Sequence, residues 1–175
     1  MTNVTFGVAE IFDYNTGKEI YNKKNRRQSS WGFSSNVFDW SDGSPAAKDG
    51  GIYNKEAYEL CKPIIIPNLT LTRIRVGMIV NSGPEDEHDP HIDQPHMEHW
   101  TQLYYLTASD GPTNVFEEYG PEDKYYGYNN DDFTLKFQSK PEPNRSFLFD
   151  GYHWHSSSHV YGPEVRIALT LNYAK

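Results

Sequence analysis

The sequence has one cysteine, Cys61, among its 175 residues. A single cysteine cannot form an intramolecular disulfide, and it cannot supply the several thiolates of a cysteine-rich zinc site. Any metal bound by this chain must therefore be held by nitrogen and oxygen atoms.

Long apolar runs are also missing. No stretch approaches the roughly twenty apolar residues that cross a bilayer, and the first residues lack the basic and then apolar pattern of a secretion signal. We therefore expect a soluble, intracellular protein of the cytoplasm, with no membrane partner.

Positive charge is scarce as well, because 16 Lys and Arg face 24 Asp and Glu, for a formal net charge of -8. This balance disfavours nucleic acid as a partner, although the stretch 23–27 is locally basic and is interpreted as a solvated loop. The length suits one domain, residues 1–175. Because nothing in the residue pattern selects a dimer, we expect a monomer.

Short segments of strand composition dominate the chain, and aromatic residues make up 15% of it. Apolar and polar residues alternate best at 71–80, where Arg73 and Arg75 lie on the side opposite to Ile74 and Val76. The other strand candidates are residues 4–12, 100–107, 113–118, 133–137, 146–149 and 165–173. Many short strands at this spacing predict a mainly β sandwich or barrel.

Only residues 54–61 have the composition of a helix, which Pro63 would end. Residues 29–51 are rich in Ser, Gly, Asp and Pro but contain aromatic residues, so we expect an ordered loop with aromatic anchors. The acidic, tyrosine-rich segment 119–132 lacks strand alternation, and we expect a loop or lid there.

All seven histidines fall in two windows, which points to one metal site: His88, His91, His96 and His99 in the first, and His153, His155 and His159 in the second. Asp93 follows His91 by two residues, and in a strand residues two apart face the same way. Two histidines and a carboxylate on one face of a metal, with the other positions open, are typical of a non-haem Fe(II) site. An HxD triplet alone is weak evidence, because it often arises by chance.

The last strand candidate carries an arginine on its polar face. Arg166, Thr170 and Asn172 share that face, while Ile167 and Leu169 lie on the other, so Arg166 is expected to point into a polar pocket. A buried guanidinium needs an anion, and its planar fork suits a carboxylate. A structural ion pair with an internal Asp or Glu is the alternative. The segment between this strand and the preceding one is expected to form a histidine-rich turn.

Four elements in this order resemble the iron(II)/2-oxoglutarate-dependent oxygenases, particularly their prolyl 4-hydroxylase-like branch. They are HIDQP at 91–95, YYL at 104–106, GPTNVF at 111–116, and FDGYHWH at 149–155 followed by Arg166. The resemblance implies a double-stranded β-helix (jelly-roll) core at 71–175, with a short N-terminal helix and long loops. Residues 1–70 would supply a supporting strand, loop and helix and shape the substrate entrance.

The same resemblance implies the metal ligands. Fe(II) would be held by His91, Asp93 and His155. His155 is preferred because its spacing from Phe149 and Arg166 is similar to that in the family, and His153 is the closest competitor. The roles of three other histidines stay open. His88, His96 and His99 could lie beside the metal ligands, face the substrate, or lie on the surface.

For the cosubstrate, the resemblance implies that Arg166 binds the distal carboxylate of 2-oxoglutarate, with support from Tyr105 and Thr170. Ascorbate could serve as a reductant. Thr107 and Pro112 depart from the family pattern, in which Asn and Gly are usual at these positions, and this puts the substrate class in doubt.

The implied reaction is hydroxylation of a C–H bond by dioxygen, with conversion of 2-oxoglutarate to succinate and CO2. A peptide or protein side chain, such as proline, is the first expected substrate. The alternatives are a hydroxylase of a free small molecule, or a metal-binding β-barrel protein without 2-oxoglutarate chemistry.

Overall fold

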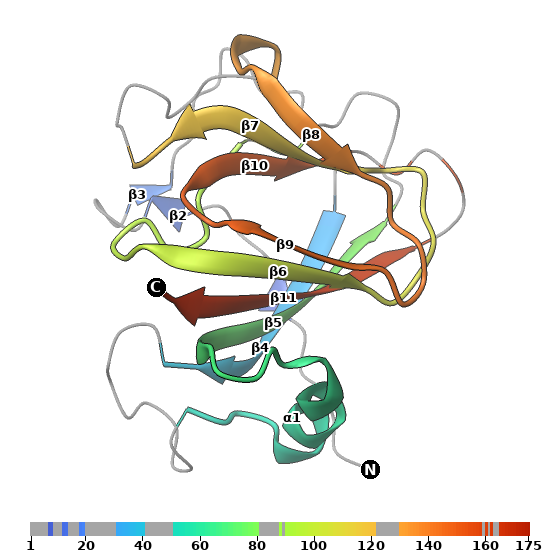
Figure 1. Ribbon diagram of the computed structural model, residues 1–175. Coiled ribbons are helices and arrows are strands. Elements are labelled where there is room, and N and C mark those ends of the chain that lie inside the picture. The colour runs from blue at the N-terminus through green and yellow to red at the C-terminus, as the bar shows by residue number, and fades with distance from the viewer. Residues whose placement is uncertain are drawn as a thin grey trace.

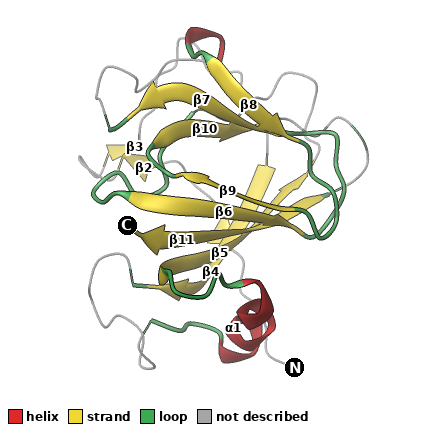
Figure 2. Cartoon of the chain, viewed as in Figure 1, coloured by secondary structure: helices red, strands yellow, loops and turns green. Residues whose placement is uncertain are grey.

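The computed structural model describes residues 7–8, 12–13, 18–19, 31–40, 51–80, 88, 90–121, 130–158, 160, 162 and 165–175. These residues form three antiparallel sheets, whose strands are yellow in Figure 2. The largest sheet has the order β1 (Gly7–Val8), β4 (Trp31–Asp39), β5 (Thr70–Val80), β11 (Arg166–Ala174), β6 (His99–Tyr105) and β9 (Ser146–Asp150). The second has the order β10 (His153–Ser157), β7 (Thr113–Tyr119) and β8 (Leu135–Ser139), and β2 (Phe12–Asp13) pairs with β3 (Lys18–Glu19). The mainly β prediction is confirmed.

The two larger sheets face each other, with β7, β8 and β10 above β6, β9 and β11 in Figure 1. Apolar side chains from both sheets meet between them, where Leu103 and Phe149 pack with Val115. We call the face of the six-stranded sheet that carries Leu103 and Phe149 its inner face. The facing sheets enclose the layer in which the candidate site lies.

The opposite, outer face of the six-stranded sheet is covered by α1 (Lys55–Cys61) and η1 (Lys62–Ile64), and α1 lies at the bottom of Figure 1. The Asn54 side chain caps the helix by accepting a 2.8 Å hydrogen bond from the backbone N–H of Ala57. Pro63 lies in the 3-10 turn that follows. The buried residues of this core are Val37, Phe38, Cys61, Ile74, Leu169, Leu171 and Tyr173. The helix predicted at 54–61 is therefore confirmed.

Along β5 and β11 apolar and polar side chains alternate between the outer and inner faces of the six-stranded sheet, as predicted from the sequence. Ile74 and Leu171 contribute to the outer core, whereas Arg73 and Asn172 turn to the inner face and are register partners. Thr170 is the register partner of Arg75 on the same face. The polar residues of these strands therefore lie toward the second sheet.

The loop predicted at 29–51 is wrong for its first part, because residues 31–39 form β4. This strand pairs with β5 from Trp31, opposite Val80, to Asp39, opposite Arg73. The Ser, Gly and Asn residues of β4 have a low preference for strands, so the sequence does not indicate one. The strand forms because its backbone N–H and C=O groups pair with those at the edge of β5. A bulge between Asn36 and Phe38 breaks the alternation, so that the adjacent Val37 and Phe38 are both buried. Residues 41–50 lie outside the described residues.

The histidine-rich turn is also wrong, because residues 153–157 form β10, which pairs with β7. The other predicted strands occur within a few residues of their predicted limits. Of the N-terminal strand prediction, β1 joins the large sheet through β4, and residues 4–6 and 9–11 lie outside the described residues. Within 119–132, Tyr119 ends β7, η3 spans Asn130–Asp132, and residues 122–129 lie outside the described residues, as do 23–27 and His159.

In the part of the chain that the structure describes, none of the helices has the length and apolar composition needed to cross a membrane.

Candidate metal and cosubstrate site

His91 and His155 are joined through their backbones. The N–H of His91 donates to the carbonyl of His155 at 2.9 Å, and the N–H of His155 donates to the carbonyl of His91 at 3.0 Å. Residues paired directly across an antiparallel bridge project their side chains to the same side. The two imidazole rings are accordingly 4.6 Å apart between centroids. This pair is an isolated bridge followed by a bend at Asp93, so strand alternation is not what places His91 and Asp93 together.

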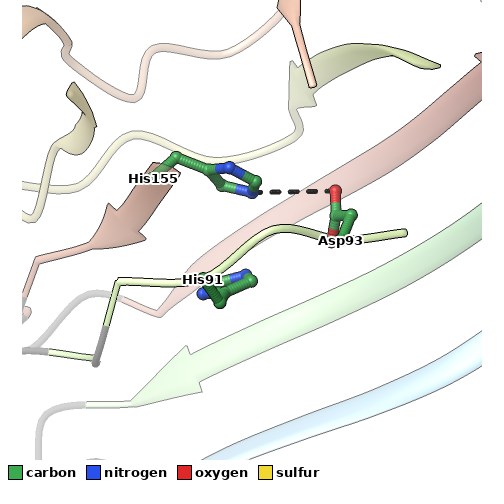
Figure 3. A group of neighbouring side chains, drawn as sticks. All are labelled: His91, Asp93 and His155. Atoms are coloured by element: carbon green, nitrogen blue, oxygen red, sulfur yellow. Dashed lines mark ion pairs between the residues drawn. The ribbon is translucent and has the colours of Figure 1, made fainter. Parts of the chain in front are cut away.

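Asp93 completes a three-residue cluster with the two histidines, drawn in Figure 3. One ligand atom from each of His91, Asp93 and His155 lies within 4.8 Å of the others. His155 Nε2 is 3.7 Å from Asp93 Oδ2. Two imidazole nitrogens and one carboxylate oxygen on neighbouring side chains fit the facial arrangement of a non-haem Fe(II) site, with the remaining positions open. That these residues bind metal stays a prediction.

The Asp93 carboxylate is ionised in this setting. Burial alone would raise its pKa, but the Arg73 guanidinium, the His155 ring and Arg75 together hold the pKa well below its ordinary value. Arg73 Nη2 is 2.8 Å from Asp93 Oδ1, and Arg75 Nη2 is 3.7 Å from the same oxygen. The carboxylate is therefore available as an anionic ligand at neutral pH.

His153, the competing ligand candidate, lies apart from the cluster. Its Nε2 is 3.1 Å from Lys136 Nζ, and its ring packs edge-on against Tyr119 with centroids 5.1 Å apart. The pairing of β10 with β7 shifts register between the two histidines, because His153 is opposite Tyr119 and His155 is opposite Val115. The geometry therefore favours His155 as the ligand.

The remaining described histidines occupy three different environments. His96 is exposed and His88 is half-buried. His99 is fully buried, so the surface alternative is wrong for it. Its Nδ1 is 2.9 Å from the carbonyl of Met97, and burial is the main cause that lowers the pKa of the imidazole. His99 lies outside the group of three possible ligands.

Arg166 lies on the inner face of β11 with 3% of its surface exposed. Its Nη2 donates to Thr113 Oγ1 at 2.5 Å, and its guanidinium carbon lies 5.6 Å from the centre of the Tyr105 ring. The other two nitrogens, Nε and Nη1, are buried and have no hydrogen-bond partner among the residues that the structure describes. Burial lowers the pKa of this guanidinium. Among the described residues no acidic side chain pairs with Arg166, so the structural ion-pair alternative finds no partner there.

Tyr105 and Thr170, the residues predicted to support the cosubstrate, are both buried. The Tyr105 hydroxyl is 2.7 Å from Thr113 Oγ1, so Tyr105, Thr113 and Arg166 form one connected group. Thr170 shares the face of Arg166, four residues further along β11. Its position agrees with a supporting role, which stays a prediction.

The connected group of Tyr105, Thr113 and Arg166 lies close to the histidine cluster along β7. Thr113, which holds Arg166, is two residues before Val115, and Val115 is the register partner of His155. Two residues along a strand span about 7 Å. Phe149 packs edge-on against His155, with ring centroids 5.2 Å apart, and stacks on Phe147. A small dicarboxylate could therefore reach from Arg166 to the cluster beside an aromatic wall.

Sequence reasoning missed several residues of this site. In the sequence Thr113 stands out only as part of the GPTNVF motif, and Arg73 only as a residue on the polar side of a strand, and neither pattern indicates the contacts that they make. Asn172 was placed on the face of Arg166, which was the available signal, but its hydrogen bond to Asp93 could not be foreseen. The pairing of β11 with both β5 and β6 brings these residues together.

Comparison with known proteins identifies the fold. No family model matches the chain, and no curated protein matches it. Among solved structures, E. coli ycfD has a TM-score of 0.52 at 12% identity, covering 90% of this chain and 37% of that chain. AviO1 from Streptomyces viridochromogenes Tue57 has a TM-score of 0.50 at 11% identity, covering 88% and 76%. An oxidoreductase of the 2OG-Fe(II) oxygenase family from Burkholderia pseudomallei has a TM-score of 0.48 at 11% identity, covering 82% and 66%.

The chain thus spans just over a third of the length of E. coli ycfD. At these identities the likeness concerns the fold, and none of the three structures is described as a prolyl 4-hydroxylase. The protein has the mainly β, double-stranded β-helix (jelly-roll) fold predicted from its motifs.

Proposed function

We propose that this protein is an Fe(II)- and 2-oxoglutarate-dependent dioxygenase that hydroxylates a C–H bond of its substrate. One observation carries the proposal. The guanidinium of Arg166 is buried, and two of its nitrogens have no hydrogen-bond partner in the described part of the chain. It lies in the same layer as two histidines and a carboxylate that can share a metal. A buried charge without an anion is costly, and this supports an anionic ligand for Arg166.

His91, Asp93 and His155 would hold the metal through one atom each. When bound, Fe(II) and 2-oxoglutarate supply the oxidising chemistry, in which the keto acid is converted to succinate and CO2 as the substrate is hydroxylated. The part of the protein is to keep one side of the metal covered by its own ligands and to leave the other positions open. The backbone bridge between the two histidines holds them in place before metal arrives.

Arg166 would bind the distal carboxylate of 2-oxoglutarate through the N–H groups that Thr113 does not engage, because Nη2 donates one of its two N–H groups to Thr113 and Nε and Nη1 have no hydrogen-bond partner among the described residues. Tyr105 fixes the orientation of Thr113 through its hydroxyl and lies beside the guanidinium. Phe147 and Phe149 would exclude water from the region between the carboxylate and the metal.

The primary substrate is proposed from the sequence resemblance alone. A peptide or protein side chain, such as proline, is the first candidate, and a free small molecule is the second. Ascorbate is included as a reductant on the same basis. A metal-binding β-barrel protein without 2-oxoglutarate chemistry is the contrasting account, and it leaves the orphan guanidinium of Arg166 unexplained.

The test is conversion of 2-oxoglutarate to succinate in the presence of dioxygen, Fe(II) and ascorbate, with proline-containing peptides and free amino acids as candidate substrates. We expect succinate from the wild-type protein, and a fall of about 30-fold or more in Arg166→Ala, since removing one partner of a buried charge pair costs about 2–5 kcal/mol. His155→Ala should also lose activity. Equal succinate formation by wild type and both variants would overturn the proposal.

A further inference from the structure

A row of three side chains on neighbouring strands faces Asp93. Asn172 on β11 is the register partner of Arg73 on β5 and of Thr101 on β6. Asn172 and Thr101 are fully buried, and the Arg73 side chain is 13% exposed. Because paired residues on adjacent strands project to the same face, the sheet itself sets the order Arg73, Asn172, Thr101.

Hydrogen bonds lock this row together. Arg73 Nε donates to Asn172 Oδ1 at 2.9 Å, and Asn172 Nδ2 donates to Thr101 Oγ1 at 3.0 Å. Thr72 Oγ1 donates to the backbone carbonyl of Asn172 at 3.1 Å. Since its amide is engaged through both oxygen and nitrogen, Asn172 cannot flip without breaking these bonds, and it fixes the plane of the Arg73 guanidinium.

The two oxygens of Asp93 meet different partners in this arrangement. Oδ1 lies 2.8 Å from Arg73 Nη2 and 3.7 Å from Arg75 Nη2. Oδ2 accepts a 3.2 Å hydrogen bond from Asn172 and lies 3.7 Å from His155 Nε2. Oδ2 therefore lies toward His155, while Oδ1 is held against the arginines.

We propose that Arg73, aligned by Asn172, is a positioning residue that keeps Asp93 a ligand through one oxygen. This inference rests on the proposed function, because it presupposes a metal between His91, Asp93 and His155. If Oδ1 were released, the carboxylate could bind through both oxygens and occupy a position that the keto acid needs. Arg73 thus prevents the second oxygen of Asp93 from taking a metal coordination position that the keto acid needs. It acts through Asp93 and does not contact the cosubstrate.

The prediction separates metal binding from cosubstrate binding. In Arg73→Met the nearer of the two cations beside Oδ1 is removed and Arg75 remains at 3.7 Å, so Oδ1 is held less firmly. Affinity for Mn(II), a redox-stable stand-in for Fe(II), should therefore be unchanged or higher. Affinity of the Mn(II)-loaded protein for 2-oxoglutarate should fall about 10-fold or more, although Arg166 is intact. If Arg73 served only in packing, its replacement would weaken the affinities for Mn(II) and 2-oxoglutarate together, or would change neither.

The experiment is calorimetric titration of the full chain with Mn(II), and then of the Mn(II)-loaded protein with 2-oxoglutarate. Arg73→Lys keeps a charge but lacks the planar fork that Asn172 aligns, so it should lose part of the 2-oxoglutarate affinity and serves if Arg73→Met does not fold. Arg145→Met is the matched control, because Arg145 is an exposed arginine paired with Glu142. Weakening of 2-oxoglutarate without weakening of Mn(II) supports the inference. Unchanged 2-oxoglutarate affinity, or an equal loss of both affinities, overturns it.

A crystal structure of the Mn(II)-loaded proteins keeps this inference distinct from the proposed function. If the wild type binds Mn(II) but not 2-oxoglutarate, the dioxygenase proposal fails while the coordination of Asp93 is still observed. One Asp93 oxygen on the metal in the wild type and two in Arg73→Met would support the positioning role. The same coordination in both proteins would overturn it.

Discussion

His91 and His155 face each other across a single antiparallel bridge, each donating its N–H to the carbonyl of the other, at 2.9 and 3.0 Å. One histidine comes from a loop and the other from β10, so the bridge is what brings two distant parts of the sequence into register. Backbone pairing does not depend on a metal. The histidine pair is therefore assembled by folding, and a metal would find it already in place.

The first prediction concerns the choice of ligand on β10. We expect His155→Ala to weaken Mn(II) binding by more than about 100-fold, because loss of a direct ligand should exceed the 10- to 100-fold effect of residues around a metal site. His153→Ala is the matched control, since His153 contacts Lys136 and Tyr119 instead of Asp93. Calorimetric titration with Mn(II) measures both. A larger loss in His153→Ala than in His155→Ala would contradict the assignment.

The second prediction concerns the stability cost of Arg166. Replacing a buried ion pair by apolar side chains of similar volume often leaves stability unchanged or raises it by about 1–4 kcal/mol. Among the described residues Arg166 has no acidic partner that its replacement would leave behind. We therefore expect Arg166→Met to have a free energy of unfolding equal to or above that of the wild type when 2-oxoglutarate is absent. In the wild type, Mn(II) together with 2-oxoglutarate should raise the free energy of unfolding above its value with Mn(II) alone. In Arg166→Met, adding 2-oxoglutarate to the Mn(II)-loaded protein should cause no such increase.

Urea unfolding of both proteins, with and without the keto acid, checks this prediction. A loss of several kcal/mol in the ligand-free variant would mean that Arg166 is a structural residue of the core. That result would remove the main support for a cosubstrate site.

The third prediction concerns the close packing of Gly151 on His99. A Cβ at Gly151 would overlap the ring of His99 and lie 2.6 Å from Thr101 Oγ1, so Gly151→Ala should destabilise the protein by about 1–3 kcal/mol. Gly77→Ala is the control, because a Cβ at Gly77 meets no atom within 4 Å. Thermal unfolding should show a lower Tm for Gly151→Ala and an unchanged or higher Tm for Gly77→Ala. Equal changes in Tm for the two variants would show that the His99 side chain moves aside at little cost and would contradict the prediction.

The fourth prediction concerns the pH dependence that Asp150 contributes. Burial raises the pKa of its carboxyl, but the hydrogen bonds from Lys175, Tyr152 and Tyr119 and the charge of Lys175 outweigh burial and leave the pKa below its ordinary value. A lowered pKa means that the ionised form stabilises the folded state. This stability is present above the unfolded pKa of about 3.9 and is lost as the pH falls through the folded pKa.

We therefore expect Asp150→Asn to lower the free energy of unfolding by about 1 kcal/mol at pH 7, and by progressively less as the pH falls below about 4. Urea unfolding at several pH values measures this difference. A difference that is the same at pH 7 and pH 3 would show that charge is not its cause.

Much of the fold could be predicted because its strands carry local signals. The alternation of β5 separates Arg73 and Arg75 from Ile74, and the structure places them on opposite faces. β4 could not be predicted in this way. Its Gly, Ser and Asn residues have low strand preference, and the strand exists because the backbone of β5 offers it partners.

The candidate site was predictable in its residues but not in its contacts. The motifs grouped His91, Asp93 and His155, and the structure brings them together. The ion pair of Arg73 with Asp93, in contrast, joins residues on separate elements and depends on how a loop returns over the sheet. Periodicity identifies the face on which a residue lies, but it does not identify the partner that another strand or loop brings there.

The most direct test of the central claim is an anaerobic visible spectrum of the protein titrated with Fe(II) and then with 2-oxoglutarate. Our account predicts a new charge-transfer band when the keto acid binds the metal, with loss of the band in both His155→Ala and Arg166→Ala. Tight Fe(II) binding without such a band, or a band that persists unchanged in Arg166→Ala, would contradict it.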